Sequence, residues 1–291
     1  MGQVLRTTML NKATQQEHVS LKAQAWRVDF QERPSMADLR SVVIKEPRNV
    51  NAVLTPVDVE EALASGRTES GGSLIIVWMP PGVNTPPSIE HDVEAWMRDG
   101  ASSVRQTPVR ATIRTVRVIW HDTRALVYTN AEQLDDAIDA VVRFTVAERE
   151  TTALELAMGS TWASIDADAP LTHAAASRQQ KQQQHVNELT ELATRMKAMY
   201  LRVSKALEQL DPALGESSKR LYSELANAAL LWDRVEPLGE PIQFALDQYE
   251  LANTRLIEAK TAAMEHLHAM IGHVLEVGII VLLLCQLRLF W

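Results

Sequence analysis

The chain has 291 residues, of which 46% are apolar and 23% charged. A chain of this length can bury a sizeable core in one large or two ordinary domains, and its composition argues against global disorder. The formal net charge of −8 argues against general attraction to nucleic acid or anionic lipid. The single cysteine, Cys285, excludes an internal disulfide and any metal cluster built on cysteine pairs.

In the first half of the sequence, patterns typical of strands alternate with patterns typical of helices. Apolar or alternating runs predict strands at residues 20–30, 51–56 and 71–82. Serine or threonine caps followed by helical spacing predict helices at residues 35–44, 55–66 and 88–100. The run SLIIVWM is the strongest strand pattern, because glycines precede it and Pro-Pro-Gly follows it.

A hairpin and a long helix are predicted next. Two β-rich runs in residues 109–130 flank the polar turn HDTR, which indicates a hairpin. Asn130 is expected to cap a helix that ends at Gly159. The apolar side of this helix carries Leu134, Ile138, Val141, Val142 and Phe144. We therefore predict an α+β N-terminal domain over residues 1–159, with an antiparallel or mixed sheet.

The composition changes after this domain. Residues 160–184 are small, polar and rich in glutamine, which is typical of a linker. Residues 185–210 then carry apolar positions spaced by three and four, as on one side of a helix. Pro212 and Gly215 predict a turn, and a second amphipathic helix follows it. This part of the chain is therefore predicted to be all-α.

The last part of the sequence is predicted to form one long helix. After Pro241 no proline occurs, and a helix from 241 to 291 would be about 75 Å long. A helix of that length cannot stay inside one compact domain, so it must pair with other helices and project from the fold. We divide this region into a coiled-coil-like helical stalk over 185–272 and a C-terminal transmembrane anchor over 273–291.

The predicted anchor is apolar on every side. The stretch from Val274 to Trp291 would reach about 27 Å as a helix, near the hydrocarbon thickness of a thin bilayer. Glu276 suits the near interface, and Arg288 suits the far one. The alternative interpretation is a buried helix or an oligomer core, which would normally show an amphipathic stripe. The anchor is predicted to comprise Leu275, Glu276, Ile279, Ile280, Leu283, Arg288 and Trp291.

Attachment to the membrane is expected at the C-terminal end. The first 20 residues contain no apolar run of signal-peptide length. Arg6 stands where a myristoylation motif requires serine or threonine, so lipidation is rejected. We therefore expect a tail-anchored, single-pass protein with its N-terminal bulk on the cytosolic or matrix side.

The end of the chain resembles a known family. LEVGIIVLLL, residues 275–284, resembles the signature that closes proteins of the required-for-meiotic-nuclear-division family. GSLIIVWMP, RFTVAERETTALE and residues 230–251 resemble three earlier stretches of that family, in the same order along most of the chain. Val277 stands where the family has a tryptophan. The resemblance implies a membrane-bound, self-associating protein of the mitochondrial or bacterial inner membrane, and in mitochondria a role in translation.

No pattern for catalysis, cofactor binding or metal binding is found. The glycines at 66, 71 and 72 lack the spacing and lysine of a phosphate-binding loop, and Ser73 lacks the second glycine of a nucleophile elbow. His266 and His273 lie seven residues apart, too far to chelate one metal together. We predict no enzyme activity, no cofactor and no small-molecule substrate.

Basic residues gather around the predicted hairpin. Five arginines lie there: Arg105, Arg110, Arg114, Arg117 and Arg124. Arg110, Arg114 and Arg117 are candidates for contact with RNA, a ribosome or anionic lipid. A solvated sheet face is the simpler alternative, because aromatic stacking residues are sparse.

These patterns together predict a non-enzymatic, self-associating scaffold whose partners are membrane lipid and copies of itself. A ribosome or a membrane complex is a further candidate partner. The alternative function is an accessory structural subunit of a larger hetero-oligomeric membrane complex.

Overall fold

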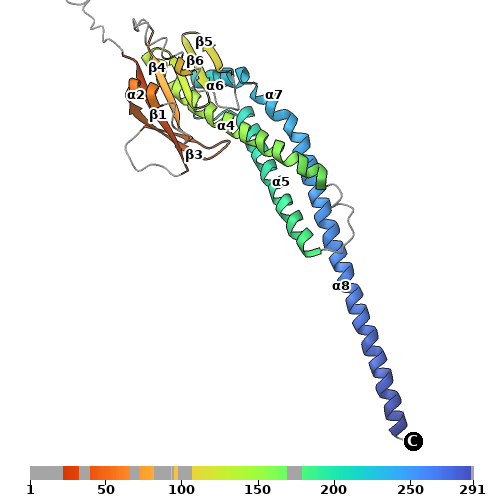
Figure 1. Cartoon of the computed structure of the whole chain (residues 1–291). Coiled ribbons are helices and arrows are strands. Elements are labelled where there is room, and N and C mark those ends of the chain that lie inside the picture. The colour runs from red at the N-terminus through yellow and green to blue at the C-terminus, as the bar shows by residue number, and fades with distance from the viewer. Residues whose placement is uncertain are drawn as a thin grey trace, which may run out of the picture. The chain divides into compact units, whose positions relative to one another are not determined.

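The computed structural model describes residues 22–32, 40–65, 72–81, 93, 95–97, 107–168 and 179–289. It divides into two compact units, each discontinuous in sequence. The first, here the sheet unit, combines Met1–Glu150 with Lys205–Trp232, and the second, the helical unit, combines Thr151–Ser204 with Asp233–Trp291. An α+β part, a helical remainder and one long apolar helix are all present (Figure 1), so the predicted fold class is confirmed.

The sheet unit is built on a seven-stranded mixed sheet. Its strands are β1 (Gln24–Gln31), β2 (Ser41–Ile44), β3 (Val50–Val57), β4 (Leu74–Met79), β5 (Val109–Ile113), β6 (Val116–His121) and β7 (Arg124–Tyr128). Their order across the sheet is β2-β3-β1-β4-β7-β6-β5. Neighbours are antiparallel except β4 and β7, which are parallel. The strands predicted at 20–30, 51–56 and 71–82 correspond to β1, β3 and β4.

The central strand β4 is covered on both sides, and all six of its residues are buried. Leu74, Ile76 and Trp78 belong to one hydrophobic cluster, whereas Ile75, Val77 and Met79 belong to a second. Because side chains alternate across a strand, a strand covered on both faces needs a continuous apolar run. The sequence SLIIVWM meets that need.

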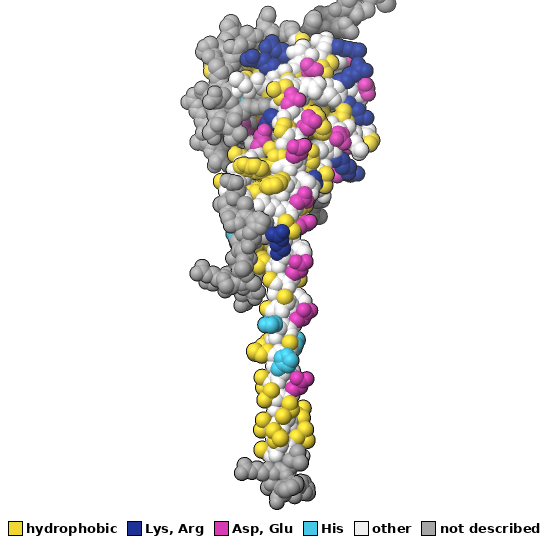
Figure 2. All heavy atoms as spheres, turned by 90° about the vertical axis from the view of Figure 1, so that its right-hand side faces the viewer, with side chains coloured by type: hydrophobic (Ala, Val, Ile, Leu, Met, Phe, Trp, Pro, Cys, Tyr) yellow, Lys and Arg dark blue, Asp and Glu magenta, His cyan; other side chains and the backbone are white. Residues whose placement is uncertain are grey.

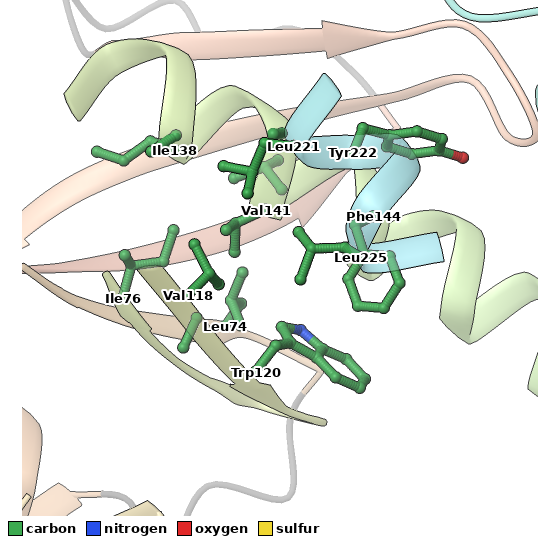
Figure 3. Packing of buried hydrophobic residues seen from close by; sticks show 14 of the residues in the cluster. Leu74, Ile76, Val118, Trp120, Ile138, Val141, Phe144, Leu221, Tyr222 and Leu225 are labelled. Atoms are coloured by element: carbon green, nitrogen blue, oxygen red, sulfur yellow. The ribbon is translucent and has the colours of Figure 1, made fainter. Parts of the chain in front are cut away.

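The larger cluster lies between the sheet and two helices, the first part of α4 (Ala131–Asp168) and α6 (Glu216–Ala228). Figure 3 shows Phe144 from α4 and Leu225 from α6 close to Trp120 of β6. The rings of Trp120 and Phe144 meet edge to face with centroids 5.0 Å apart. The indole Nε1 of Trp120 donates to Thr145 Oγ1 at 2.9 Å, which satisfies its one polar atom inside the core.

The predicted helix at 35–44 is wrong where the structure describes it. Residues 41–44 form β2, which pairs antiparallel with β3 and alternates between exposed and buried side chains. Val42 and Ile44 reach the core, and Val43 is 55% exposed. The β-branched run Val-Val-Ile favours an extended chain over a helix, and pairing with β3 reinforces that preference.

Two predicted helices of the first half are found with different limits. Helix α2 (Val59–Ser65) begins later than predicted, because Thr55 and Pro56 belong to β3. Its cap is Asp58, whose Oδ1 accepts from the Glu60 backbone N–H at 2.8 Å. Of the predicted helix at 88–100, the described residues 93 and 95–97 are helical, and the others lie outside the described residues.

The predicted hairpin at 109–130 contains three strands instead of two. The second turn, between β6 and β7, lies within the predicted HDTR sequence. The first turn, between β5 and β6, uses Arg114 with a φ of 50°, and Asp122 in the second turn has a φ of 54°. Asp is a common residue at positive φ and Arg is not, so only the second turn had a recognisable sequence.

The helical unit packs the second part of α4 with α5 (Gln179–Glu208) and the start of α8 (Gly239–Leu289). Its core contains Leu154 and Met158 of α4, Met196 of α5, and Ile242 and Tyr249 of α8. Arg234, in the short helix α7 (Leu231–Val235), donates to both carboxylate oxygens of Glu155 at 2.8 and 2.6 Å. This two-point ion pair fixes α7 to α4 inside the helical unit.

Three predicted limits in the second half differ from the structure. Helix α4 continues beyond Gly159 to Asp168, and a side chain at Gly159 would meet nothing within 4 Å, so no close contact requires the glycine. Residues 160–168 and 179–184 of the predicted linker are helical, and the rest lie outside the described residues. The second amphipathic helix is broken at Leu230, whose φ of 54° separates α6 from α7. A 3-10 turn, η2 (Glu236–Leu238), then precedes α8.

Candidate membrane anchor and arginine surface

Helix α8 is 51 residues long and changes character along its length. Up to Leu256, one side of the helix is buried in the helical unit; the buried residues are Ile242, Ala245, Tyr249, Ala252 and Leu256. From Glu258 onward, nearly every described side chain is exposed. A long stretch of α8 therefore has no cover among the residues that the structure describes (Figure 1).

The uncovered stretch becomes apolar towards its end. Figure 2 shows acidic and histidine side chains along the middle of α8 and a hydrophobic segment beyond them. A window of the helical stretch Leu231–Gln286 has a mean hydropathy of 2.1, and none of that window is buried. Length and composition therefore make α8 a candidate transmembrane helix. A helix buried in the core of the described fold, the alternative interpretation, does not fit these exposures.

The apolar residues of the predicted anchor lie on one side of this segment, because they are spaced by four, one and three residues along the helix. Leu275, Ile279, Ile280 and Leu283 are all more than half exposed. Arg288 falls within α8, but its side chain and the whole of Trp291 lie outside the described residues. The four apolar positions therefore present a continuous surface that requires lipid or other protein around it.

Glu276 lies one helical turn beyond His273. His273 Nδ1 and Glu276 Oε2 are 3.4 Å apart, and both side chains are largely exposed. His266 and His273 line one shallow hollow of α8 together with apolar side chains such as Met270 and Val274. Within the described part of the chain, no group of three histidine, cysteine or acidic side chains could hold a metal. The histidines are therefore polar positions beside an apolar stripe.

This apolar stripe continues the buried side of α8. The spacing of three and four that joins Ile242 to Leu256 leads on to Ala263, Met270, Val274 and Val281. Glu258, Glu265 and Glu276 lie on the other side of the helix. The side of α8 that is buried within the helical unit thus stays apolar beyond Leu256, where the other described helices no longer cover it.

The candidate arginines do not form one patch. Arg110 pairs across the strands with Ile119, and Arg117 pairs with Thr112, which places both arginines on the same face of the sheet. The guanidinium carbon of Arg117 lies 5.6 Å from the centroid of the Tyr128 ring. Arg114 occupies the β5–β6 turn and lines a separate cavity of about 250 Å³ with residues of α4 and α6. All three side chains are exposed.

Arg124 is not part of the basic surface, and here the sequence interpretation is wrong. Its side chain is buried, with 1% of the residue exposed. Its Nη1 donates to the Trp96 carbonyl, and its guanidinium carbon lies 5.1 Å from the centroid of the Trp96 ring. His121 Nδ1 is also 3.0 Å from the Met97 carbonyl. Together these two side chains fix residues 96–97 to the β6–β7 turn, a role that only tertiary contacts reveal. Arg105 lies outside the described residues.

Comparisons with known proteins leave the family open. No protein-family model matches the sequence, and no curated protein matches it either. One solved structure, that of the full-length CmaX protein, is similar over 86% of this chain and 80% of that chain. Its sequence identity is 10% and its TM-score 0.36, and a likeness at this level carries no argument about fold or function. The family resemblance stated above stays a prediction.

Proposed function

We propose that the protein is a non-enzymatic scaffold that α8 attaches to a membrane and that associates with copies of itself through the same helix. The observation that carries this proposal is the uncovered apolar stretch of α8, with none of its most apolar window buried. Exposed apolar surface of this size in water is unfavourable by about 25 cal/mol for each Å². Lipid and helices of other protein chains, including further copies of α8, are surroundings that remove it from water.

Lipid suits the last part of the uncovered stretch. From Val277 to Cys285 no charged side chain occurs, and leucine, isoleucine and valine face every direction. Such residues each favour insertion by about 0.3 to 0.6 kcal/mol at the centre of a transmembrane helix. Glu276 marks the start of this apolar segment, where a carboxylate stays hydrated at the membrane surface.

Self-association suits the part that precedes it. Between Leu256 and Glu276, α8 has an apolar side and an acidic side, which is the pattern of a helix that packs against another helix in water. The apolar side carries Ala263, Met270 and Val274, and Met270 and Val274 are 59% and 67% exposed. Because this stripe continues one that already packs against α4 and α5, parallel copies of α8 would extend the same kind of packing.

The size of the protein in mild detergent tests this proposal. The full chain is expected to elute as a homo-oligomer in size-exclusion chromatography with light scattering. Met270→Glu combined with Val274→Glu places charge in the apolar stripe, and we expect it to weaken association at least tenfold. Thr261→Glu, on the acidic side of the same helix, is the matched control and should leave the oligomer intact.

A monomeric wild-type chain would contradict self-association. Co-purification of a second protein in fixed stoichiometry would instead favour the alternative, an accessory structural subunit of a hetero-oligomeric membrane complex. Insensitivity to the double glutamate substitution would show that another surface joins the copies.

The family resemblance narrows the proposal further. It supports placing the protein in a mitochondrial or bacterial inner membrane, with the folded units on the matrix or cytosolic side and a role near the translation machinery. We propose that contact with a ribosome would occur through the exposed arginines Arg110 and Arg117 on one face of the sheet and through Arg114 in the adjoining turn.

Removing these three charges tests the translation role. With Arg110→Gln, Arg114→Gln and Arg117→Gln combined, ribosome co-sedimentation at low salt is expected to fall by about tenfold or more, because each phosphate contact contributes to a salt-dependent affinity. The matched control replaces Arg195, Arg202 and Arg255, exposed arginines elsewhere in the chain, by glutamine. Co-sedimentation that is equal in the two triple variants would count against this role.

A further inference from the structure

A cavity of about 230 Å³ opens in the sheet unit, apart from α8. The connection between β2 and β3, helix α4, the end of α5, the loop from α5 to α6, and α6 itself all contribute to its wall. Ala206, Leu210 and Leu214 supply an apolar lining. The volume lies just below the usual range for small-molecule sites, so the cavity suits a ligand of a few carbon atoms.

Charged side chains of both signs stand around this apolar lining. Arg143 Nη1 donates to Asp211 Oδ2 at 2.8 Å, and Lys205 Nζ donates to Glu46 Oε1 at 2.9 Å. The remaining charged residue of the wall is Lys45, which forms no ion pair with any residue that the structure describes. Three cations and two carboxylates thus line the cavity, and Asp139, outside the lining, also pairs with Arg143 at 3.8 Å. Lys45, which has no ion pair of its own in the described structure, is the lining group that would attract a negative charge.

Tyr222 adds a hydrogen-bond donor to the same wall. The residue is 5% exposed, and its ring packs in the larger hydrophobic cluster. Its hydroxyl points away from the other side chains labelled in Figure 3 and makes no hydrogen bond to any described residue. Burial raises the pKa of Tyr222, so the hydroxyl keeps its proton at neutral pH and remains a donor.

Arg143 carries a buried polar atom that makes no hydrogen bond to a described residue. Its Nε is buried and makes no hydrogen bond within the described structure, and the nearest carboxylate oxygen, on Asp139, is 3.8 Å away. Buried polar groups are nearly always hydrogen-bonded, so the unused Nε donor of Arg143 leaves room for an acceptor in the cavity.

We propose that this cavity binds a small monocarboxylate with an apolar body. The carboxylate accepts a hydrogen bond from the Tyr222 hydroxyl and is attracted by Lys45 and Arg143. The hydrocarbon part lies against Leu210 and Leu214. This site belongs to the sheet unit alone and does not depend on the proposed membrane attachment or self-association.

Binding of hexanoate to the full chain in lipid nanodiscs tests the proposal, with empty nanodiscs subtracted. Ligand-observed NMR titration is expected to give saturable binding with a Kd of about 1 mM, which is reasonable for a ligand of this size. Hexanamide has the same shape without the charge and is expected to bind about tenfold more weakly. Inorganic phosphate, which lacks the apolar part, should not displace hexanoate at equal concentration.

Single substitutions locate the site. Tyr222→Phe removes only the hydroxyl, and Lys45→Gln removes only the unpaired charge; each should weaken hexanoate binding about tenfold. Lys22→Gln removes an exposed charge of the sheet unit outside the cavity and should leave binding unchanged. The circular dichroism of Tyr222→Phe should match the wild type, which separates loss of binding from loss of fold. Absent saturation, equal binding of hexanamide, displacement by phosphate, or wild-type affinity in both variants would each overturn the assignment.

Discussion

Lysine at both Ile280 and Leu283 is expected to release the protein from membranes. Both side chains lie in the apolar segment of α8 and are more than half exposed. Near the centre of a transmembrane helix, each apolar residue favours insertion by about 0.5 kcal/mol, and each lysine opposes it by about 3 kcal/mol. The two substitutions together should therefore cost about 7 kcal/mol, more than a single short helix can offset. Carbonate extraction of cell membranes, followed by flotation, measures this release.

Two lysines placed earlier on the same helix provide the control. Ile257→Lys and Met264→Lys add the same charge at positions that are 53% and 51% exposed but precede the apolar segment. This variant should stay in the membrane fraction. Extraction of the wild-type protein by carbonate would exclude a membrane anchor and favour an oligomer core made of α8. Retention of the Ile280 and Leu283 double variant in the membrane would show that attachment occurs elsewhere.

Truncation of Trp120 to alanine should be the most destabilising single change in the sheet unit. Trp120 is 2% exposed, contacts Phe144 edge to face, and donates to Thr145. Loss of a buried tryptophan costs about 3 to 5 kcal/mol, from both lost burial and the cavity left behind. Amide hydrogen exchange in β4, which is buried on both faces, should then accelerate by a factor of about 100 to 4,000 under conditions where exchange follows unfolding of the unit. Hydrogen–deuterium exchange of the full chain, followed by mass spectrometry, measures this acceleration in β4.

Two further variants separate the contributions at this position. Trp120→Phe keeps an aromatic ring beside Phe144 but loses the indole N–H, so the increase in exchange should be smaller than with alanine. Val43→Ala alters an exposed side chain of β2 and should change exchange in β4 by less than about threefold. If β4 exchanges equally fast in wild type and Trp120→Ala, the cluster around Trp120 does not determine the stability of the sheet unit.

Local sequence patterns were sufficient to predict an element wherever residues close together in the chain determine its structure. The run from Leu74 to Met79 is apolar at every position, which is the pattern expected of a strand that is buried on both faces. The side of α4 that carries Ile138 and Phe144 was recognisable because helical spacing alone brings these residues together. The long α8 was predictable for the same reason, since no proline interrupts it after Pro241.

Local patterns failed where distant segments decide the outcome. Residues 41–44 have helical spacing with the residues before them, but β3 offers them a strand partner, and sheet pairing prevails. Gly159 indicated a helix end, yet the helix continues because nearby residues on both sides pack in the helical unit. Arg124 looked like a surface cation until its contact with Trp96 showed that it is buried.

The sequence by itself determined the class of the fold, the central strand, and the long apolar helix, because each depends on residues that are neighbours in the chain. The two discontinuous units, the separation of Arg114 from Arg110 and Arg117, and the cavity that joins Lys45 to Tyr222 were decided only by the tertiary structure. The units and the cavity join residues that are far apart in the sequence through sheet pairing or helix packing, whereas the β5–β6 turn separates Arg114 from its sequence neighbours Arg110 and Arg117. No periodicity along the chain encodes such meetings, whereas burial and pairing in three dimensions require them.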